Sequence, residues 1–309
     1  MIHWRVQTSS ARKLRIAAIQ YLNPAPLMWD FEHAPERTRL AERYAIHATL
    51  PAQCAEALNA GSADIGLIPA TAYATTPGLA ILPGCVIASL DAVRSILLVM
   101  RAGQEVNALR RVAMDPASRS SNTYAQILLR RFHGVAPEFF LRTMPKNSDP
   151  TCAVDAAALL RDCDAAVLIG DPALRMIEES EASHAGGGAS VRCIDLAREW
   201  HVHTGLPWVS AFWAVRPEAI AASCHAASDI VEDFLRSRDH GLQHLEEIVA
   251  EWTPRLAGPP AIAASTIRAY LRENIHYIFD DACRAGLECF YRYAAEMKIL
   301  PEVPPLRFL

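Results

Sequence analysis

The segment Leu14–Leu27 reads LRIAAIQYLNPAPL and changes character in its middle. Up to Ile19 it is apolar and favours a β-strand, after which Asn23 is followed by Pro24 and Pro26. Proline fixes its own φ and biases the residue before it away from the helical region, which predicts a stiff turn at Asn23 beyond the carboxyl end of a strand. In open α/β sheets that edge is where ligands bind. An amide there can both donate and accept hydrogen bonds without adding charge.

The composition is that of an ordinary globular protein. The chain has 309 residues, of which 51% are hydrophobic and 21% charged, enough for one large or two medium domains. Thirty basic and thirty-four acidic residues give a net charge of −4, which argues against a nucleic-acid partner. No segment approaches the roughly 20 apolar residues of a membrane helix, and no apolar signal core opens the chain. Eight scattered cysteines without a C-x-x-C pair predict reduced thiols, so we expect a cytoplasmic protein that does not bind membranes.

Alternating strand and helix patterns predict a parallel or mixed sheet with helices on its faces. The first strand, at residues 14–19, is followed by a helix at 51–60 that has proline in its first turn and Gly61 after its end. Further strands are predicted at residues 44–49, 64–69, 79–82, 86–89 and 94–100.

A second α/β unit is predicted after the polar stretch 101–110. Its expected strands are 112–114, 139–142 and 165–169, its helices are 123–132 and 152–161, and a surface loop with three glycines spans 178–190. A strand at 208–215 and helices at 218–237, 241–252, 261–274 and 281–296 follow. We therefore expect lobe 1 to combine residues 1–105 and 208–309 and lobe 2 to be an insertion of residues 106–207. The chain would cross near 101–110 and 203–210, around a central cleft that can close by hinge motion.

Short hydroxyl side chains surround the start of the helix predicted after Asp115. Ser118, Ser120 and Ser121 lie there with Arg119, so backbone N–H groups, hydroxyls and a guanidinium converge at a helix N-terminus. Such an end favours an anion, which predicts a bound carboxylate or phosphate. The alternative is that one serine only caps the helix.

Three further polar residues lie at strand ends. Ser95 opens a strand and could face the cleft, while Arg94 before it could form an ion pair between the lobes; the alternative is a solvent-facing pair. Asp171 follows the strand 165–169 and could orient Arg119, cap the next helix or support the structure.

Two histidine pairs have spacings that metal sites use. His201 and His203 would share one face of a strand, and His240 and His244 one face of a helix. Each pair lacks a nearby third and fourth ligand, so the sequence predicts no metal site. No Ser-His-Asp order or G-x-S-x-G elbow is present.

Several motifs, taken in order, resemble the chorismate dehydratase family of the futalosine route to menaquinone. They lie at residues 19–27, 63–69, 93–98, 118–121, 165–174, 199–200 and 204–209. The likeness extends from about Leu14 to Val215 and more loosely to the C-terminus. The chain departs from the family pattern at residues 70–73, which lack a glutamate before Tyr73, and at 90–92, where Leu-Asp-Ala replaces Asp-Gly-Pro.

The resemblance implies a type II periplasmic-binding-protein-like fold and a reaction without a metal or organic cofactor. Water would be removed from chorismate to give 3-[(1-carboxyvinyl)oxy]benzoate. Asn23 and Ser95 would lie at the reacting centre, and the hydroxyls and backbone amides of residues 118–121 around a substrate carboxylate.

The general base stays open in the sequence. One hypothesis is that the enolpyruvyl carboxylate of the substrate takes the proton, and Glu199 is the first protein group to test against it. Two other functions are a binding or sensor protein for a small carboxylate, and the related dihydroxynaphthoate synthase of the same pathway. Oligomeric state is not predicted.

Overall fold

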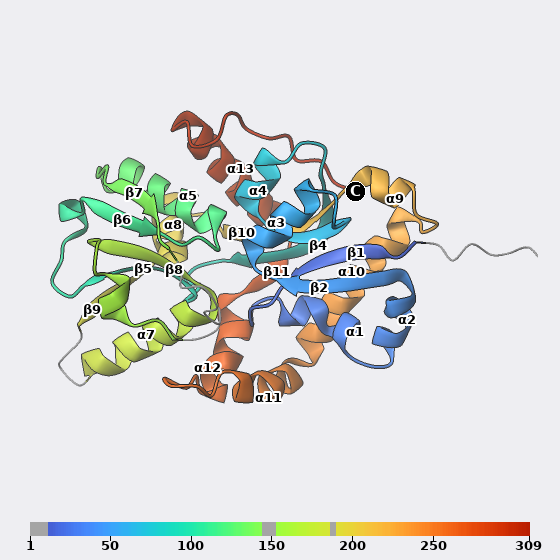
Figure 1. Ribbon diagram of the computed structural model, residues 1–309, viewed down its shortest axis with the longest axis horizontal. Coiled ribbons are helices and arrows are strands. Elements are labelled where there is room, and N and C mark those ends of the chain that lie inside the picture. The colour runs from blue at the N-terminus through green and yellow to red at the C-terminus, as the bar shows by residue number, and fades with distance from the viewer. Residues whose placement is uncertain (1–11, 144–152, 186–189) are drawn as a thin grey trace, which may run out of the picture.

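The structure, a computed structural model, describes residues 12–143, 153–185 and 190–309. Its described strands form a six-stranded sheet, in the order β11-β4-β10-β3-β1-β2, and a five-stranded sheet, in the order β7-β6-β8-β5-β9. The two sheets lie side by side, the first on the right and the second on the left in Figure 1. The helices pack on both faces of each sheet.

The first sheet is mixed. Strand β1 pairs in parallel with β2 and β3, and β10 lies antiparallel between β3 and β4. The strands are β1 (Leu14–Ile19), β2 (Tyr44–Thr49), β3 (Ile65–Pro69), β4 (Ala80–Ser89), β10 (Trp208–Val215) and β11 (His276–Ile278). Its helices are η1 (Ala25–Met28), α1 (Trp29–Glu32), α2 (Glu36–Arg43), α3 (Pro51–Asn59), α4 (Ala70–Thr75), α9 (Pro217–Ala221), α10 (Ala227–Gln243), α11 (Leu245–Arg255), α12 (Ala264–Ala269), η4 (Tyr270–Asn274) and α13 (Asp281–Glu296).

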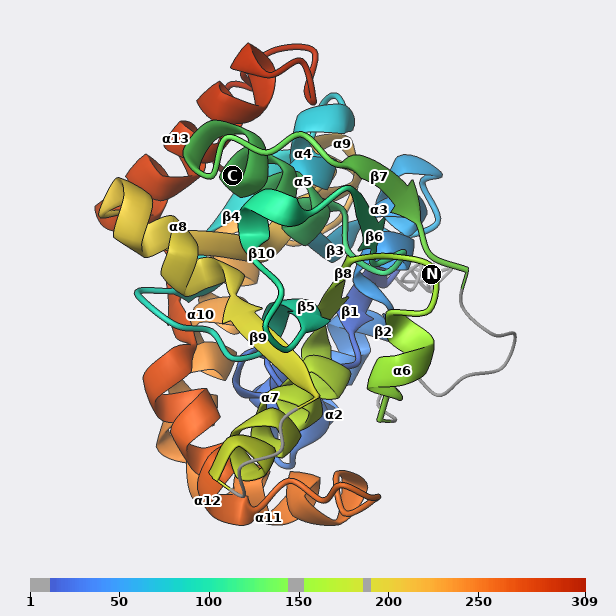
Figure 2. The same ribbon diagram turned by 90° about the vertical axis from the view of Figure 1, so that its left-hand side faces the viewer.

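The second sheet combines parallel strands with β5, which is antiparallel to β8 and β9. Its strands are β5 (Ile96–Arg101), β6 (Arg111–Met114), β7 (Glu138–Leu141), β8 (Ala165–Ile169) and β9 (Val191–Asp195). Its helical segments are η2 (Val106–Ala108), α5 (Arg119–Ile127), η3 (Leu128–Phe132), α6 (Ala156–Leu159), α7 (Gly170–Ala185) and α8 (Leu196–Thr204). Figure 2 shows α5 and α8 on one side of this sheet and α6 and α7 on the other.

Strand β5 corrects the predicted lobe boundary. It pairs Leu97 with Leu168 of β8 and Leu98 with Ile194 of β9, so it belongs to the second sheet. The first crossing between the sheets therefore lies between the end of β4 at Ser89 and Ile96, and not at residues 101–110. The sequence misleads here because a strand buried on both faces carries no mark of the sheet that it joins. The chain returns between Thr204 and Trp208.

Helix α7 also differs from the prediction, because it continues through residues 178–185, which we expected to be loop. Buried Met176 and Ile177 continue its apolar face, and the following Glu and Ala residues favour helix. The three glycines at 186–188 lie outside the described residues, as does Cys152. The seven described cysteines are free thiols.

An aromatic cluster joins the two halves where the chain returns. The ring of Tyr124 in α5 stacks on Trp208 of β10 at 3.7 Å and on Phe290 of α13 at 4.0 Å between centroids. Its hydroxyl is also 3.3 Å from the backbone nitrogen of Val209. All three rings are fully buried, so the position of α5 is fixed against the first sheet.

Candidate active site

A cavity lies between the two sheets and is lined from both. Six of its lining residues come from the side of the second sheet, and the others from the side of the first. The lining residues are Ile19, Tyr21, Asn23, Pro51, Pro69, Ile87, Ser95, Ile96, Ser118, Ser121, Ile169, Gly170, Ser210 and Ala211. The empty space amounts to about 460 Å³, but only about 40 Å³ is open to the centre of a water molecule. The cavity is therefore narrow.

Asn23 follows β1 on the turn that Pro24 helps to fix, as the sequence predicted, and it lines the cavity. The hydroxyl of Tyr277 in β11 donates to its backbone carbonyl over 3.0 Å. The side-chain Oδ1 of Asn23 is buried and has no hydrogen-bond partner among the described residues. A buried polar atom without a partner costs free energy, which a hydrogen bond from a ligand in the cavity would recover.

Ser95 lines the opposite wall, just before β5, and is only 1% exposed. The hydroxyl of Tyr270 in η4 donates to its Oγ over 2.7 Å. Burial raises the pKa of Tyr270 far above its usual range, so this phenol keeps its proton. Because Oγ of Ser95 accepts the hydrogen bond from Tyr270, the hydroxyl hydrogen of Ser95 is left to donate elsewhere.

The N-terminus of α5 forms one end of the cavity. Ser118 caps the helix: its Oγ accepts from the backbone nitrogen of Ser121 at 3.2 Å and lies 2.9 Å from Oγ of Ser121. Both side chains line the cavity. Ser118 therefore caps α5, and the same end of the helix also faces the cavity. Ser120 does not line it; its Oγ accepts from the backbone nitrogen of Thr71 in α4 at 3.0 Å, across the cleft.

Arg119 is not brought to the cavity. It is the first residue of α5, and its half-exposed guanidinium lies 3.5 Å from Glu56 of α3. A side chain at that helix position points away from the serines on the cavity face.

Arg94 anchors the turn before β5. Its φ is +61°, a left-handed conformation, and its backbone nitrogen donates to the carboxylate of Asp195 at 2.5 Å. The guanidinium binds Glu178 and Glu181 of α7, at 2.6 and 2.8 Å. Helix α7, which carries both carboxylates, directly follows β8, and β8 and β5 are neighbours in the second sheet. The ion pair therefore lies within one half and outside the cavity, and does not join the lobes as we expected.

Asp171 has a supporting role across the cleft. It lies in the first turn of α7, is 1% exposed, and accepts from the backbone nitrogen of Leu22 at 3.2 Å. This contact holds the turn that carries Asn23 against the second half of the molecule.

Sequence reasoning missed Tyr21, Ser210, Tyr270 and Tyr277. Ser210 is a polar residue in the otherwise apolar strand β10, a signal that could have been noticed. Tyr21 lies inside the opening motif; burial, and then the carboxylates of Asp115 and Asp171, raise its pKa far above the usual range. Tyr270 and Tyr277 come from a C-terminal segment whose sequence gives no sign of the cavity.

The lining is electrically neutral. Among the described residues that line the cavity there is no Asp, Glu, His, Lys, Arg or Cys. Glu199, the first candidate for a general base, lies in α8, where its Oε2 is 3.1 Å from Nε2 of His133. The cavity can therefore bind an anion through neutral hydrogen-bond donors and a helix N-terminus. Its described lining provides no carboxylate or imidazole that could act as a base on a reacting carbon.

Of the two histidine pairs noted in the sequence, one lies in α8 and the other at the end of α10. His201 and His203 lie in the helix α8 and not in a strand. Residues two positions apart in a helix point to different faces, so these two imidazoles do not face each other. His240 instead contacts Asp30, with Nδ1 and Oδ1 2.8 Å apart. Among the helices that the structure describes, none has the length and apolar character to span a bilayer.

Solved structures with the same fold share little sequence with the chain. Protein AF1704 from Archaeoglobus fulgidus superposes with a TM-score of 0.65 at 16% identity, over 94% of this chain and 99% of the other. The periplasmic aliphatic sulphonate binding protein SsuA from Escherichia coli gives 0.61 at 18% identity, over 94% of each chain. A Candida albicans gene product with the generic periplasmic binding protein structural fold gives 0.60 at 14% identity, over 96% and 97%. The predicted two-lobe fold is confirmed.

Similarity in sequence identifies the family of the chain more closely than similarity in fold does. A chorismate dehydratase of Thermus thermophilus is 28% identical over 293 residues, which are 92% of this chain and 95% of the relative. The family model described as menaquinone biosynthesis matches residues 14–296. The match runs from the first residue of β1 to the last residue of α13. The chain therefore belongs to the menaquinone biosynthesis family.

Proposed function

We propose that this protein is a chorismate dehydratase, a hydro-lyase of menaquinone biosynthesis. It removes water from chorismate and releases 3-[(1-carboxyvinyl)oxy]benzoate. The family and the Thermus thermophilus relative support this activity. The observation that carries it is the meeting of Asn23, Ser95, Ser118 and Ser121 in one neutral cavity, from segments far apart in the sequence.

The N-terminus of α5 is the proposed carboxylate site. Chorismate is a dianion, and the described part of the chain supplies no cationic side chain to the cavity lining. The positive end of a nine-residue helix, with the hydroxyls of Ser118 and Ser121, provides the compensating donors. An exposed interaction of this kind is worth about 0.3–1 kcal/mol, and more where the site is shielded from water.

Asn23 and Ser95 are the proposed reacting-centre residues. The proton that leaves is on the ring carbon next to the one that bears the hydroxyl, and its electrons delocalise into the conjugated ring carboxylate. Expulsion of the hydroxyl then gives water and an aromatic ring. The amide of Asn23 and the hydroxyl of Ser95 hold the departing oxygen and fix the ring conformation.

The proposed base is the enolpyruvyl carboxylate of the substrate itself. Among the described residues that line the cavity, its one ionisable rival is Tyr21, whose raised pKa keeps the phenol protonated. Glu199 is engaged with histidines outside the cavity. The proton therefore passes from the ring carbon to the substrate carboxylate and on to the departing hydroxyl, which leaves as water and restores the carboxylate.

A product assay tests the proposal. Purified protein is incubated with chorismate, and the mixture is separated by chromatography and analysed by mass spectrometry. Formation of a product lighter by one water, with the retention of authentic 3-[(1-carboxyvinyl)oxy]benzoate, is expected. Intact chorismate together with a raised melting temperature would indicate a carboxylate-binding protein instead. Neither turnover nor stabilisation would reject chorismate as the ligand. A cytoplasmic location stays a prediction.

A further inference from the structure

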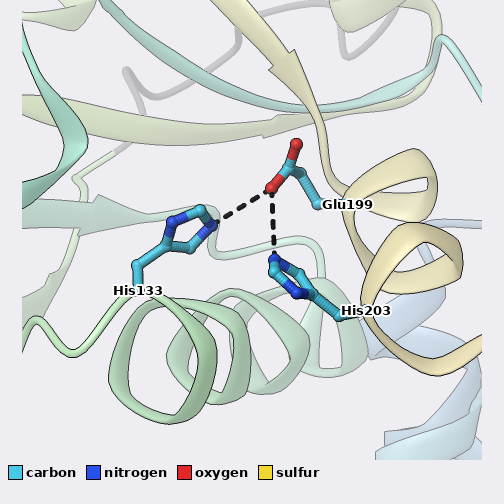
Figure 3. A group of neighbouring side chains, drawn as sticks. All are labelled: His133, Glu199 and His203. Carbon is cyan, nitrogen blue, oxygen red and sulfur yellow. Dashed lines mark hydrogen bonds and ion pairs between the residues drawn. The ribbon is translucent and has the colours of Figure 1, made fainter.

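Outside the cavity, two histidines and a glutamate converge on the surface of α8. Glu199 and His203 are one helical turn apart, and His133 follows η3 on the neighbouring segment (Figure 3). Oε2 of Glu199 is 3.1 Å from Nε2 of His133 and 3.7 Å from Nε2 of His203. The three ligand atoms lie within 4.8 Å of one another.

The rings are held in place by packing. His203 stacks on Phe132, with centroids 4.5 Å apart and planes at 7°. His133 lies perpendicular to His203 at 5.5 Å. The side chain of His133 is 27% exposed, that of Glu199 30% and that of His203 29%, so solvent reaches all three. A metal ion could enter from solvent, and a water could complete its coordination.

We propose that His133, Glu199 and His203 bind one divalent transition-metal ion of the zinc class. Two imidazole nitrogens and a carboxylate oxygen are a ligand set that Zn²⁺ uses, with a water in the fourth position. Bond lengths of 2.0–2.2 Å put tetrahedral ligand atoms about 3.3–3.6 Å apart, close to both distances from Glu199. The two imidazoles contact the same carboxylate oxygen, and an ion between them would replace that contact.

The ion would connect α8 to the segment that continues α5. None of the three ligands lines the cavity, so the ion is not a participant in the proposed dehydration. It would instead fix the far end of the α5–η3 helical segment, whose N-terminus faces the cavity.

A second group, His276, Asp280 and Cys283, also has ligand atoms within reach of one another. It is less suited to a metal, because Asp280 is already engaged as the cap of α13, where it accepts from the backbone nitrogen of Cys283 at 2.8 Å. This group provides the control.

Titration of chelator-treated protein with Co²⁺ and Zn²⁺ tests the site, followed by visible absorption and by calorimetry. We expect one saturable equivalent, with cobalt bands typical of nitrogen and oxygen ligands and no thiolate-to-cobalt band. His133→Ala and His203→Ala should each weaken binding by about tenfold or more, since loss of an outer-sphere contact alone costs that much. His276→Ala should bind as the parent protein does.

Two results would overturn the inference. One is the absence of saturable binding by the folded parent protein, and the other is loss of binding in His276→Ala with retention in His203→Ala. Circular dichroism establishes that each variant is folded. If His203→Ala is not, His203→Gln keeps a planar group against Phe132 while removing the ring nitrogen. Metal binding is read without substrate, so the outcome is independent of the dehydratase assay.

Discussion

The phenol of Tyr270 donates a hydrogen bond to Oγ of Ser95 over 2.7 Å, in a fully buried position. Tyr270 belongs to the C-terminal segment and Ser95 to the first crossing between the sheets. The contact orients the Ser95 hydroxyl with a donor that itself stays protonated, because burial raises the pKa of the phenol. Tyr270 is thus a positioning residue for the proposed reaction.

Replacing Tyr270 by Phe should lower kcat for chorismate by about tenfold, the equivalent of one orienting hydrogen bond. KM should change less, because the carboxylate donors at α5 are untouched. Initial rates at varied chorismate concentration separate the two constants. A KM effect with normal kcat would show that Tyr270 shapes binding and not the orientation of Ser95.

Replacing Asn23 by Ala should reduce kcat/KM by about a hundredfold, as for loss of a donor at a reacting centre. The melting temperature should fall little, because the side-chain oxygen that is removed has no hydrogen-bond partner in the described structure. Asn59→Ala, at the exposed end of α3, is the matched control for loss of an amide. Normal turnover by Asn23→Ala would remove this residue from the mechanism.

Ser118 allows capping to be separated from substrate binding. Ser118→Ala should lower the free energy of unfolding by about 1 kcal/mol through loss of the helix cap, and should raise KM. Ser118→Asp keeps an acceptor for the backbone nitrogen of Ser121, so stability should be retained. Its negative charge should nevertheless repel chorismate and raise KM more than the alanine does. Equal KM values for Ser118→Asp and the parent protein would place the substrate carboxylate elsewhere.

Glu199→Gln should turn over chorismate within about twofold of the parent protein when both are chelator-treated, as expected for a change away from the reacting atoms. The kcat–pH profile of the two proteins should also superimpose. A folded Glu199→Gln protein that binds chorismate yet forms no product would show that Glu199 is the base. The enolpyruvyl carboxylate of the substrate would then not be the base.

Asp64 should make stability depend on pH at the acid end. Burial opposes ionisation of this carboxyl, but hydrogen bonds from Arg15 and Arg12 outweigh it and lower its pKa from 3.8 to about 2. A carboxyl with a lowered folded-state pKa stabilises the protein above its unfolded pKa and loses that contribution as pH falls toward the folded value. Unfolding by urea at stepped pH should show a loss between about pH 4 and pH 2 that is absent in Asp64→Asn. Parallel pH curves would contradict this assignment.

Local chemistry made part of the fold and site predictable. The prolines after Asn23 and the serines around residue 118 have strong local preferences, and both segments lie where strand-end reasoning places them. Local chemistry could not show that β5 pairs with β8, since either sheet would bury the same apolar side chains. Nor could it show that Arg119 would turn toward Glu56, because that depends on where α3 packs. Tyr270 and Tyr277 reach Ser95 and Asn23 through tertiary packing alone.

The narrowness of the cavity has a kinetic consequence. About 460 Å³ lies empty between the halves, but only about 40 Å³ of it is open to the centre of a water molecule. If the halves separate to admit substrate, the measured affinity is the affinity of the open form scaled by the fraction of molecules that are open. Contacts across the cleft, such as that of Ser120 with the backbone of Thr71, would then set the residence time of the product without touching it.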